Sequence, residues 1–471
     1  MATSPPASIP PERPGPHTST LSKQRKPLPT TPVVADVVSL SHDGRGVAHV
    51  DGKAVFVHGA LPGEQVLLRY TRRARRHDEG MVTEVVRASP ARVEPRCAHF
   101  GVCGGCALQH MDPTAQVHLK AQVLAETLAR IGQVAPARWL PPLSGAPWGY
   151  RRKARLGVRR VAKKGRVLVG FRERGSSFVA DLQHCDVLHP AVGARLPALA
   201  ALVDSLSIRE RLPQIEMAQG DGPPVLVLRV LDPPSAEDVQ KLQAFAADTG
   251  LRLYLQPGGT DTIAPLPGQD VQLSYRLPMP ELQRASSGDL DILFEPADFT
   301  QVNLEMNRRM VDQALGLLDP QPDAAVLDLF CGLGNFTLPV ARRAGRVVGV
   351  EGDAGLVARA RRNAAHNGID NVEFQCADLY AEPTAAAPWH GQRFDLALLD
   401  PPRSGAREVL DPLAATGVRR LVYVSCYPAT LARDAEHLVH GLGFRLMAAG
   451  AMDMFPHTAH LESMAVFERG V

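Results

Sequence analysis

The feature that most constrains the fold is an alternation of short apolar runs and helical segments after residue 294. Five runs are typical of strands, at residues 325–330, 346–351, 372–377, 394–400 and 421–425, and helical segments include 354–367 and 429–441. Strands that alternate with helices predict a mostly parallel, doubly wound sheet with helices on both faces, an α/β fold. Ligands of such sheets bind beyond the carboxyl ends of the strands, so the residues that follow each run are the candidates for a site.

The chain of 471 residues is too long for one domain. Its composition changes from segment to segment before residue 296. Residues 1–33 carry nine prolines and one acid, which predicts a disordered basic tail. Residues 34–92 hold short Val-rich runs separated by Asp-Gly and Pro-Gly turn signals, which predicts a small β-barrel. Residues 93–295 mix helical and strand patterns. The predicted domains are therefore 1–33, 34–92, 93–295 and 296–471.

Two basic stretches stand out from a net charge of only +3. The first is Arg72, Arg73, Arg75 and Arg76, between the last two runs of the predicted barrel. The second is residues 151–174, with eleven Lys or Arg against the single acid Glu173. Either stretch fits an RNA backbone, and either also fits a merely solvated surface.

Seven cysteines, an odd number, argue against a disulfide framework. The chain has no secretion-signal pattern and no run of eighteen apolar residues, so we expect a cytoplasmic protein without a membrane span. Three cysteines cluster among glycines and a fourth follows downstream: Cys97, Cys103, Cys106 and Cys185. Four such thiolates suit either zinc or an iron–sulfur cluster, and composition does not choose between them. Cys331 and Cys376 are expected to serve packing.

The first predicted strand of the C-terminal sheet ends in a glycine turn at Gly332 and Gly334, which lets a ligand approach the backbone. The second strand ends in Glu351, at the spacing of an acid that binds a ribose. Asp378 follows the third strand, where it can accept an adenine amino group. Thr337 replaces the last glycine of a dinucleotide fingerprint. The pattern therefore favours a nucleoside cofactor without phosphates over NAD.

The fourth and fifth predicted strands end in residues suited to chemistry. Asp400 is followed by two prolines and Arg403, and the prolines fix an extended turn that aims the carboxylate into the crevice. Cys426 follows the fifth strand, where active-site residues of this fold gather. Glu462 lies just before the final apolar run, where an unpaired acid is costly to bury.

Five strings, in this order, resemble the RNA (uracil-5-)-methyltransferase family. They are Phe-Thr-Gln-Val-Asn at 299–303, Asp-Leu-Phe-Cys-Gly-Leu-Gly-Asn-Phe at 328–336, Asp-Pro-Pro-Arg at 400–403, the run from Val to Asp at 424–434, and His-Thr-Ala-His-Leu-Glu at 457–462. The barrel resembles a TRAM domain, an RNA-binding module. A TRAM domain with a cysteine cluster resembles the layout of the 23S ribosomal RNA uracil methyltransferases. Tyr427 departs from the family, in which Asn is common after the cysteine.

The resemblance implies a Rossmann-like class I methyltransferase domain that uses S-adenosylmethionine. It implies that Cys426 adds to carbon 6 of a uracil and that Glu462 is the base that removes the proton from carbon 5. It places six residues at the cofactor: Gln301, Phe330, Asn335, Glu351, Asp378 and Asp400. It implies a [4Fe–4S] cluster on Cys97, Cys103, Cys106 and Cys185. The implied partner is 23S ribosomal RNA, with U1939 as the expected target, flipped out or unpaired, and a monomeric enzyme.

Four other functions compete with this interpretation. The same chemistry on transfer RNA is disfavoured by the barrel and the cysteine cluster, whereas a dual-site ribosomal RNA enzyme has the same layout. An adenine amino-methyltransferase also has an acid-Pro-Pro motif, but Arg403 and the Ser425-Cys426 strand end disfavour it. A non-catalytic RNA-binding ribosome assembly factor is disfavoured by the intact Cys426 and Glu462.

Overall fold

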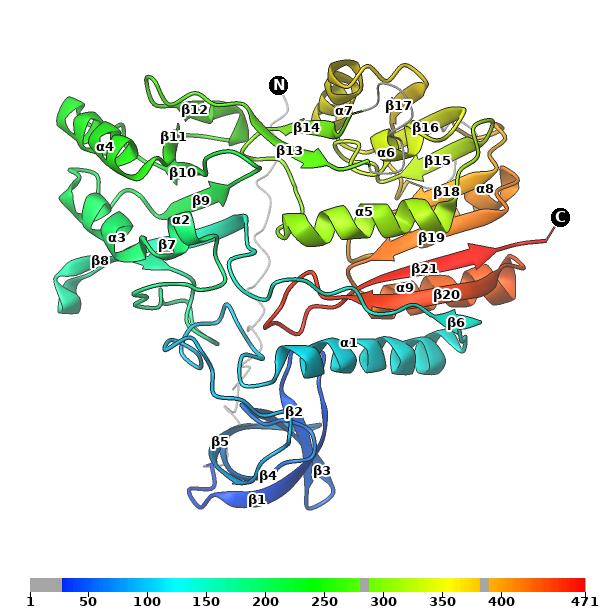
Figure 1. Cartoon of the computed structure of the whole chain (residues 1–471). Helices are drawn as coiled ribbons and strands as arrows, with labels where there is room; N and C mark the ends of the chain where they lie inside the picture. The colour runs from blue at the N-terminus through cyan, green and yellow to red at the C-terminus, as the bar shows by residue number, and fades with distance from the viewer. Residues whose placement is uncertain (1–27, 280–287, 382–388, 471) are drawn as a thin grey trace, which may run out of the picture.

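A computed structural model describes residues 28–279, 288–381 and 389–470. Three bodies are visible in Figure 1: a small barrel, a six-stranded sheet with its helices, and an eight-stranded sheet covered on both faces. The predicted tail at 1–33 lies almost wholly outside the described residues. Within those ranges, no helix is both long and apolar enough to cross a membrane.

The barrel forms because its strands alternate buried apolar and exposed polar side chains over short lengths. Its strands are β1 Val33–Leu40, β2 Gly46–Val50, β3 Lys53–His58, β4 Gln65–Arg73 and β5 Asp78–Arg87. They close in the order β1-β2-β3-β5-β4. The core consists of inward-facing side chains such as Ala48, Val55 and Leu68, each 0% exposed. The predicted barrel is confirmed.

The six-stranded sheet has the order β12-β11-β10-β9-β7-β8. Its strands are β7 Lys153–Val161, β8 Arg166–Gly170, β9 Gln214–Ala218, β10 Val225–Arg229, β11 Arg252–Gln256 and β12 Ala264–Pro265. The short helix α2 (Pro190–Gly193) and the helices α3 (Leu196–Ser205) and α4 (Ala236–Thr249) follow between strands. α3 and α4 bury one apolar side each against this sheet, which therefore has its own hydrophobic core.

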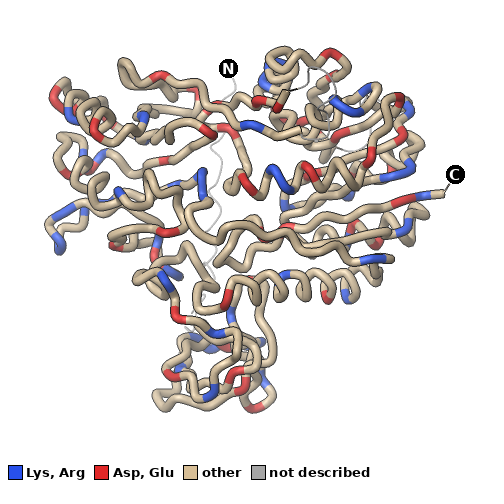
Figure 2. The backbone as a smooth tube through the Cα atoms, viewed as in Figure 1, with Lys and Arg blue, Asp and Glu red and all other residues tan. Residues whose placement is uncertain are grey.

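The basic stretch at 151–174 is less available to RNA than its sequence indicates. Arg155 pairs with Glu216, and both Lys164 and Arg166 pair with Asp181. These acids lie outside the basic stretch in sequence, so only the fold brings them to it. Figure 2 shows the same mixing, with Asp and Glu close to Lys and Arg over the whole molecule.

The eight-stranded sheet contains the predicted parallel strands and three more. Its order is β17-β16-β15-β18-β19-β21-β20-β6. The parallel strands are β15 Ala325–Leu329, β16 Arg346–Glu351, β17 Val372–Cys376, β18 Leu396–Leu399 and β19 Arg420–Ser425. The antiparallel β21 (Glu462–Glu468) and β20 (Arg445–Met452) extend it, and β6 (Arg138–Trp139) forms the edge. The predicted α/β doubly wound domain is confirmed.

Helices cover both faces of this sheet. One face packs against α5 (Leu304–Leu318), α6 (Thr337–Ala341) and α7 (Ala354–His366). The other packs against α8 (Arg407–Ala415), α9 (Pro428–Glu436) and α1 (Pro113–Thr127). Figure 1 shows α1 alongside β20, although the two are far apart in sequence.

The boundaries between the packed bodies differ from the domain boundaries that the sequence composition predicted. α1 and β6 come from the predicted central domain at 93–295 but lie on the eight-stranded sheet. The ribbon of β13 (Leu273–Leu277) and β14 (Leu290–Phe294) also shares that sheet's core. Composition does not reveal this, because the apolar faces of these elements look alike whichever sheet they cover.

Candidate active site

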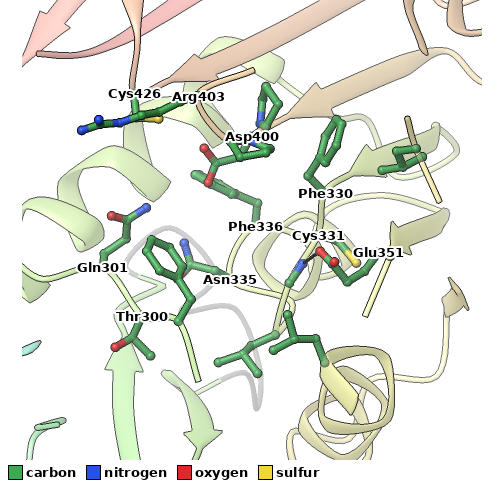
Figure 3. Close-up of a pocket in the computed structure, with 18 of the residues that line it drawn as sticks. Thr300, Gln301, Phe330, Cys331, Asn335, Phe336, Glu351, Asp400, Arg403 and Cys426 are labelled. Carbon is green, nitrogen blue, oxygen red and sulfur yellow. Dashed lines mark hydrogen bonds between the residues drawn. The ribbon is translucent and has the colours of Figure 1, made fainter. Parts of the chain in front are cut away.

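A cavity of about 580 Å³ lies beyond the carboxyl ends of the parallel strands, and we call it the active-site pocket. Every residue that the sequence placed at the cofactor or the chemistry lines it: Gln301, Phe330, Asn335, Glu351, Asp378, Asp400, Cys426 and Glu462. Figure 3 shows Cys426 and Asp400 at one end, Glu351 and Phe330 at the other, and Gln301 and Asn335 across the space. The size suits a nucleoside-sized ligand with a reacting group beside it.

The loop after β15 has the strained backbone of a binding turn. Phe330 has a φ of +64°, which a side chain with a Cβ rarely adopts, and Gly332 and Gly334 follow at +54° and +88°. Glu351, at the end of β16, accepts hydrogen bonds from the backbone N–H groups of Gly332 and Asp353, both at 3.1 Å. These hydrogen bonds fix the two strand ends together, and the predicted contact of Glu351 with a ribose stays a prediction.

Asn335 is held by residues that the sequence analysis missed. Its amide exchanges two hydrogen bonds of 2.9 Å with the amide of Asn307 on α5, and its Oδ1 also accepts from Tyr275 of β13 at 2.8 Å. Asn307 is 1% exposed. A polar residue on the apolar side of α5 was the available signal, since such a group needs a buried partner, but the sequence analysis did not single out this helix.

The end of the pocket that holds Cys426 and Glu462 disfavours the negatively charged forms of its side chains. Burial raises the pKa of Asp400 to about 7. Burial, with Asp400 nearby, raises the pKa of Glu462 to about 8, while Arg403 and Lys120 act to lower it. Burial also raises the pKa of the Cys426 thiol to about 11, with Glu462 and Asp400 adding to the rise and Arg403 opposing it. A cationic ligand would relieve this arrangement, because it stabilises the ionised acids.

Arg403 and His460 border the same end. Arg403 donates to Nδ1 of His460 at 3.0 Å, and because a guanidinium only donates, that ring nitrogen accepts. Burial and Arg403 both lower the pKa of His460, which keeps the ring neutral. The sequence analysis noted both residues in motifs but gave neither a place in the site.

Asp328 lies beneath the pocket on β15. Its Oδ2 accepts a 2.6 Å hydrogen bond from the hydroxyl of Thr337, and burial raises its pKa to about 8. Thr337 occupies the position where a dinucleotide fingerprint has its last glycine. It therefore serves an internal hydrogen bond, which agrees with a loop not built for a pyrophosphate.

The cysteine cluster forms a second cavity, of about 20 Å³, which we call the cysteine cavity. Its lining includes all four predicted thiols: Cys97, Cys103, Cys106 and Cys185. The hairpin at 172–179 is bonded to the cysteine segment, with Gly104 donating to the Arg172 carbonyl and Arg174 donating to the Cys106 carbonyl, both at 2.9 Å. Cys331 is buried as expected, but Cys376 is exposed at the end of β17.

Chemistry indicates that this cavity suits a metal. Burial raises the pKa values of Cys103, of Cys106 to about 12 and of Cys185 to about 11. Such thiols are stable as thiolates only beside strong positive charge. Cys97 also lies within 4.8 Å of ligand atoms of His184 and Asp186, which offers a mixed set of donors. Cys97, His184 and Asp186 therefore form a possible metal-binding group, and the part played by the other three cysteines is considered below.

Two family models match the chain. The tRNA (Uracil-5-)-methyltransferase model matches residues 289–470, and the TRAM domain model matches residues 33–69. Among solved structures, Pyrococcus abyssi tRNA (uracil-54, C5)-methyltransferase in complex with S-adenosyl-L-homocysteine aligns with a TM-score of 0.68 at 23% identity. The alignment covers 92% of this chain and 99% of that one. Fold and site together define a Rossmann-like, S-adenosylmethionine-dependent methyltransferase with an N-terminal TRAM barrel.

Full-length relatives narrow the class. The chain is 55% identical over 447 residues to a protein of Methylococcus capsulatus named 23S rRNA (uracil(1939)-C(5))-methyltransferase RlmD, covering 95% of this chain and 99% of the relative. A protein of the same name from Alkalilimnicola ehrlichii is 56% identical over 451 residues, with the same two coverages. The chain therefore belongs to the RNA (uracil-5-)-methyltransferase family, as its motifs predicted.

Proposed function

We propose that this protein methylates carbon 5 of a uridine in 23S ribosomal RNA, with U1939 as the target. The observation that carries the proposal is the joining of Cys426, Glu462 and the predicted cofactor residues in one pocket. The nearly full-length relatives with that activity in their names support it.

The pocket residues account for the chemistry. S-adenosylmethionine, when bound, would supply an electrophilic methyl group and leave as S-adenosylhomocysteine once the bond between its sulfur and that methyl group breaks. Carbon 5 of uracil is a weak nucleophile until the thiolate of Cys426 forms a bond to carbon 6, which turns the ring into an enolate whose carbon 5 can take the methyl group. The carboxylate of Glu462 then takes the proton from carbon 5. The electron pair of that bond restores the double bond between carbons 5 and 6 and expels the thiolate.

Arg403 and Phe299 have complementary roles in this scheme. Burial, Glu462 and Asp400 raise the pKa of the Cys426 thiol, and the Arg403 guanidinium opposes that rise, which favours the reactive thiolate. Phe299 lines the pocket yet is 70% exposed, which leaves an aromatic face at the entrance. A base inside a duplex hides carbon 6, so the target uridine must be flipped out or unpaired to reach Cys426.

The choice between ribosomal and transfer RNA rests on the sequence identity to relatives of nearly full length. The family model that matches residues 289–470 and the aligned solved structure both have transfer RNA in their names, and that structure is 23% identical to this chain. The two relatives named for 23S rRNA are 55% and 56% identical over 95% of this chain. Because this identity is much higher, we assign the ribosomal substrate.

We further propose that Cys97, Cys103, Cys106 and Cys185 bind a [4Fe–4S] cluster, that the enzyme is monomeric and that it acts in the cytoplasm. Four thiols that face one cavity match the ligand number of a cubane cluster. Methyl transfer from a sulfonium is redox-neutral, so the cluster would organise the RNA-binding half without transferring electrons.

The test is in vitro methylation with labelled S-adenosylmethionine. A 23S ribosomal RNA fragment containing U1939 should gain one 5-methyluridine, mapped by mass spectrometry, and the same fragment with U1939 replaced by cytidine should gain none. Methylation of transfer RNA instead would move the assignment to the competing substrate. Methylation at a second uridine would establish the dual-site alternative.

A further inference from the structure

The loop at residues 453–461 joins β20 to β21 and ends at Glu462, the first residue of β21. Its partners lie far away in sequence: contacts from Lys120, Gln116 and Tyr150 span 333, 341 and 306 positions. The loop that leads to the proposed base is therefore held by elements of the N-terminal half.

Lys120 makes the charged contact of this group, and it is buried. It projects from α1, and its Nζ lies 2.6 Å from Oδ1 of Asp453 and donates to the carbonyl of Phe455 at 3.1 Å. The side chains of Lys120 and Asp453 are only 4% and 6% exposed. One ammonium thus fixes two points of the loop, one by charge and one by a hydrogen bond.

Gln116, one turn earlier on α1, fixes the middle of the loop. Its Oε1 accepts from the backbone N–H of His457 at 2.8 Å, and its Nε2 donates to the carbonyls of Leu108 and Met111. His457 has a φ of +66° and stacks on Trp148 with ring centroids 3.9 Å apart. Backbone strain of this kind persists only where the surroundings enforce it.

Lys120 does not line the active-site pocket, whereas His460 and Glu462 at the far end of the loop do. Lys120 therefore acts on the site through the loop. We propose that Lys120 is a positioning residue: its buried ion pair with Asp453 holds the 453–461 loop so that Glu462 reaches the proton on carbon 5. This inference rests on the proposed function of Glu462.

An ion pair at this place is better explained by geometry than by stability. Removing two charges from water costs about as much as their attraction returns, and apolar side chains often stabilise such a position equally well. An ion pair with a second hydrogen bond instead fixes direction and distance, and a base must lie within hydrogen-bond reach of the proton that it removes. Lys120 also acts to lower the pKa of Glu462, which favours the carboxylate form.

The experiment separates formation of the covalent protein–RNA adduct from its resolution. In Lys120→Met, adduct formation and methyl transfer should proceed, but resolution should slow by about 10- to 100-fold, the usual effect of a misplacement near 1 Å. Denaturation-resistant protein–RNA complex should accumulate, while RNA affinity measured without cofactor and S-adenosylmethionine affinity stay within about twofold of the wild type. Resolution at the wild-type rate would overturn the inference.

The double variant Lys120→Met/Asp453→Leu covers the case in which the single variant is unstable. The second substitution removes the Asp453 carboxylate, which would otherwise be buried without a partner, so the melting temperature should be restored. Resolution should stay slow, because the ion pair that fixes the loop is still absent. Restored resolution would show a purely structural role and would also overturn the inference. Arg92→Met is the matched control: it breaks the buried pair of Arg92 with Glu64 at the barrel and should lower stability without accumulating adduct.

Glu462→Gln distinguishes failure of this inference from failure of the proposed function. If that variant accumulates adduct and Lys120→Met does not, only the positioning role falls. If neither forms any adduct with the 23S ribosomal RNA fragment, the proposed function falls and this inference falls with it.

Discussion

The active-site pocket and the cysteine cavity both bring together side chains from segments that are distant in sequence. Both also bury acids or thiols whose pKa values burial raises, so that their charged forms are disfavoured. They differ in the volume that they enclose. The pocket encloses about 580 Å³ and is lined by the acids Glu351, Asp378, Asp400 and Glu462, whereas the cysteine cavity encloses about 20 Å³ and four thiols line it. The first arrangement suits a cationic molecule that enters and leaves, and the second suits a metal centre that stays with the folded protein.

The difference predicts that damage to the two regions has different effects. A substitution in the pocket should stop the chemistry without unfolding the protein, because its polar groups face a ligand. A substitution in the cysteine cavity should lower stability and metal content first, since metal binding there would be part of folding.

Cys426→Ala should have the largest effect. Loss of the nucleophile should reduce turnover by on the order of 10⁴-fold or more. The other cysteine that lines the pocket, Cys331, is buried, lies beside Glu351 in Figure 3 and has a pKa that burial raises well above its ordinary value, so it should not replace Cys426. The Kd for S-adenosylmethionine, measured by calorimetry, should stay within about twofold. Multiple turnover by this variant at an appreciable rate would contradict the covalent mechanism.

Glu462→Gln should reduce turnover by roughly 10²- to 10⁴-fold at a different step. The adduct should form and become methylated, but the proton on carbon 5 should stay in place and the complex should persist on a denaturing gel. Release of free methylated RNA at the wild-type rate is the result that would remove Glu462 from its role.

The pH dependence of adduct resolution should follow Glu462. Because burial raises its pKa to about 8, most molecules carry the protonated, inactive acid at lower pH. Resolution of preformed adduct should therefore rise with pH by up to about tenfold per unit and level off above roughly pH 8. In Glu462→Gln, the slow resolution of the adduct should not rise with pH in this way. If the wild type and this variant showed the same pH dependence, the titrating group would not be Glu462.

Cys106→Ser should separate the two regions most directly. Protein purified without oxygen should fall from about four irons per chain to nearly none, and its melting temperature should fall, because four-cysteine ligation is lost. Cys376→Ser, at an exposed cysteine, is the matched control and should change neither. About one zinc in the colourless wild-type protein would assign the cavity to zinc instead.

The smallest effect is expected at the barrel, where the structure sharpens a sequence prediction. Arg72 pairs with Glu79 and Arg73 with Asp78, whereas no ion pair is found for Arg75 or Arg76 within the described part of the chain. Reversal of Arg75 and Arg76 to Glu should weaken RNA binding and flatten its log–log salt dependence by about one unit per lost phosphate contact.

The paired arginines provide the comparison for this measurement. Reversal of Arg72 and Arg73 should change the salt slope less, because their charge is already partly neutralised by Glu79 and Asp78. Filter binding over several salt concentrations measures both variants. Equal slopes for both variants and the wild type would show that the run is a solvated surface.

Part of the pocket was predictable because several of its residues lie at or just after the end of a parallel strand. Glu351, Asp378, Asp400 and Cys426 come directly after apolar runs, and parallel strands bring their carboxyl ends to one edge. Gln301 and Asn335 were placed only by the family resemblance. Asn307 and Tyr275, which hold Asn335, were missed because their partner is distant in sequence.

The sequence by itself determined the class of fold and the barrel, since periodicity and turn signals encode strands and their connections. Through its family resemblance the sequence also predicted Cys426 as the nucleophile and Glu462 as the base. The tertiary structure alone decided which charges are available and what holds the base. The acids that neutralise Arg155, Lys164 and Arg166 lie outside the basic stretch, and Lys120 meets Asp453 across 333 positions. Neither pairing leaves a local pattern, because an ion pair depends on a distance in space that only the packing of α1 on the catalytic sheet sets.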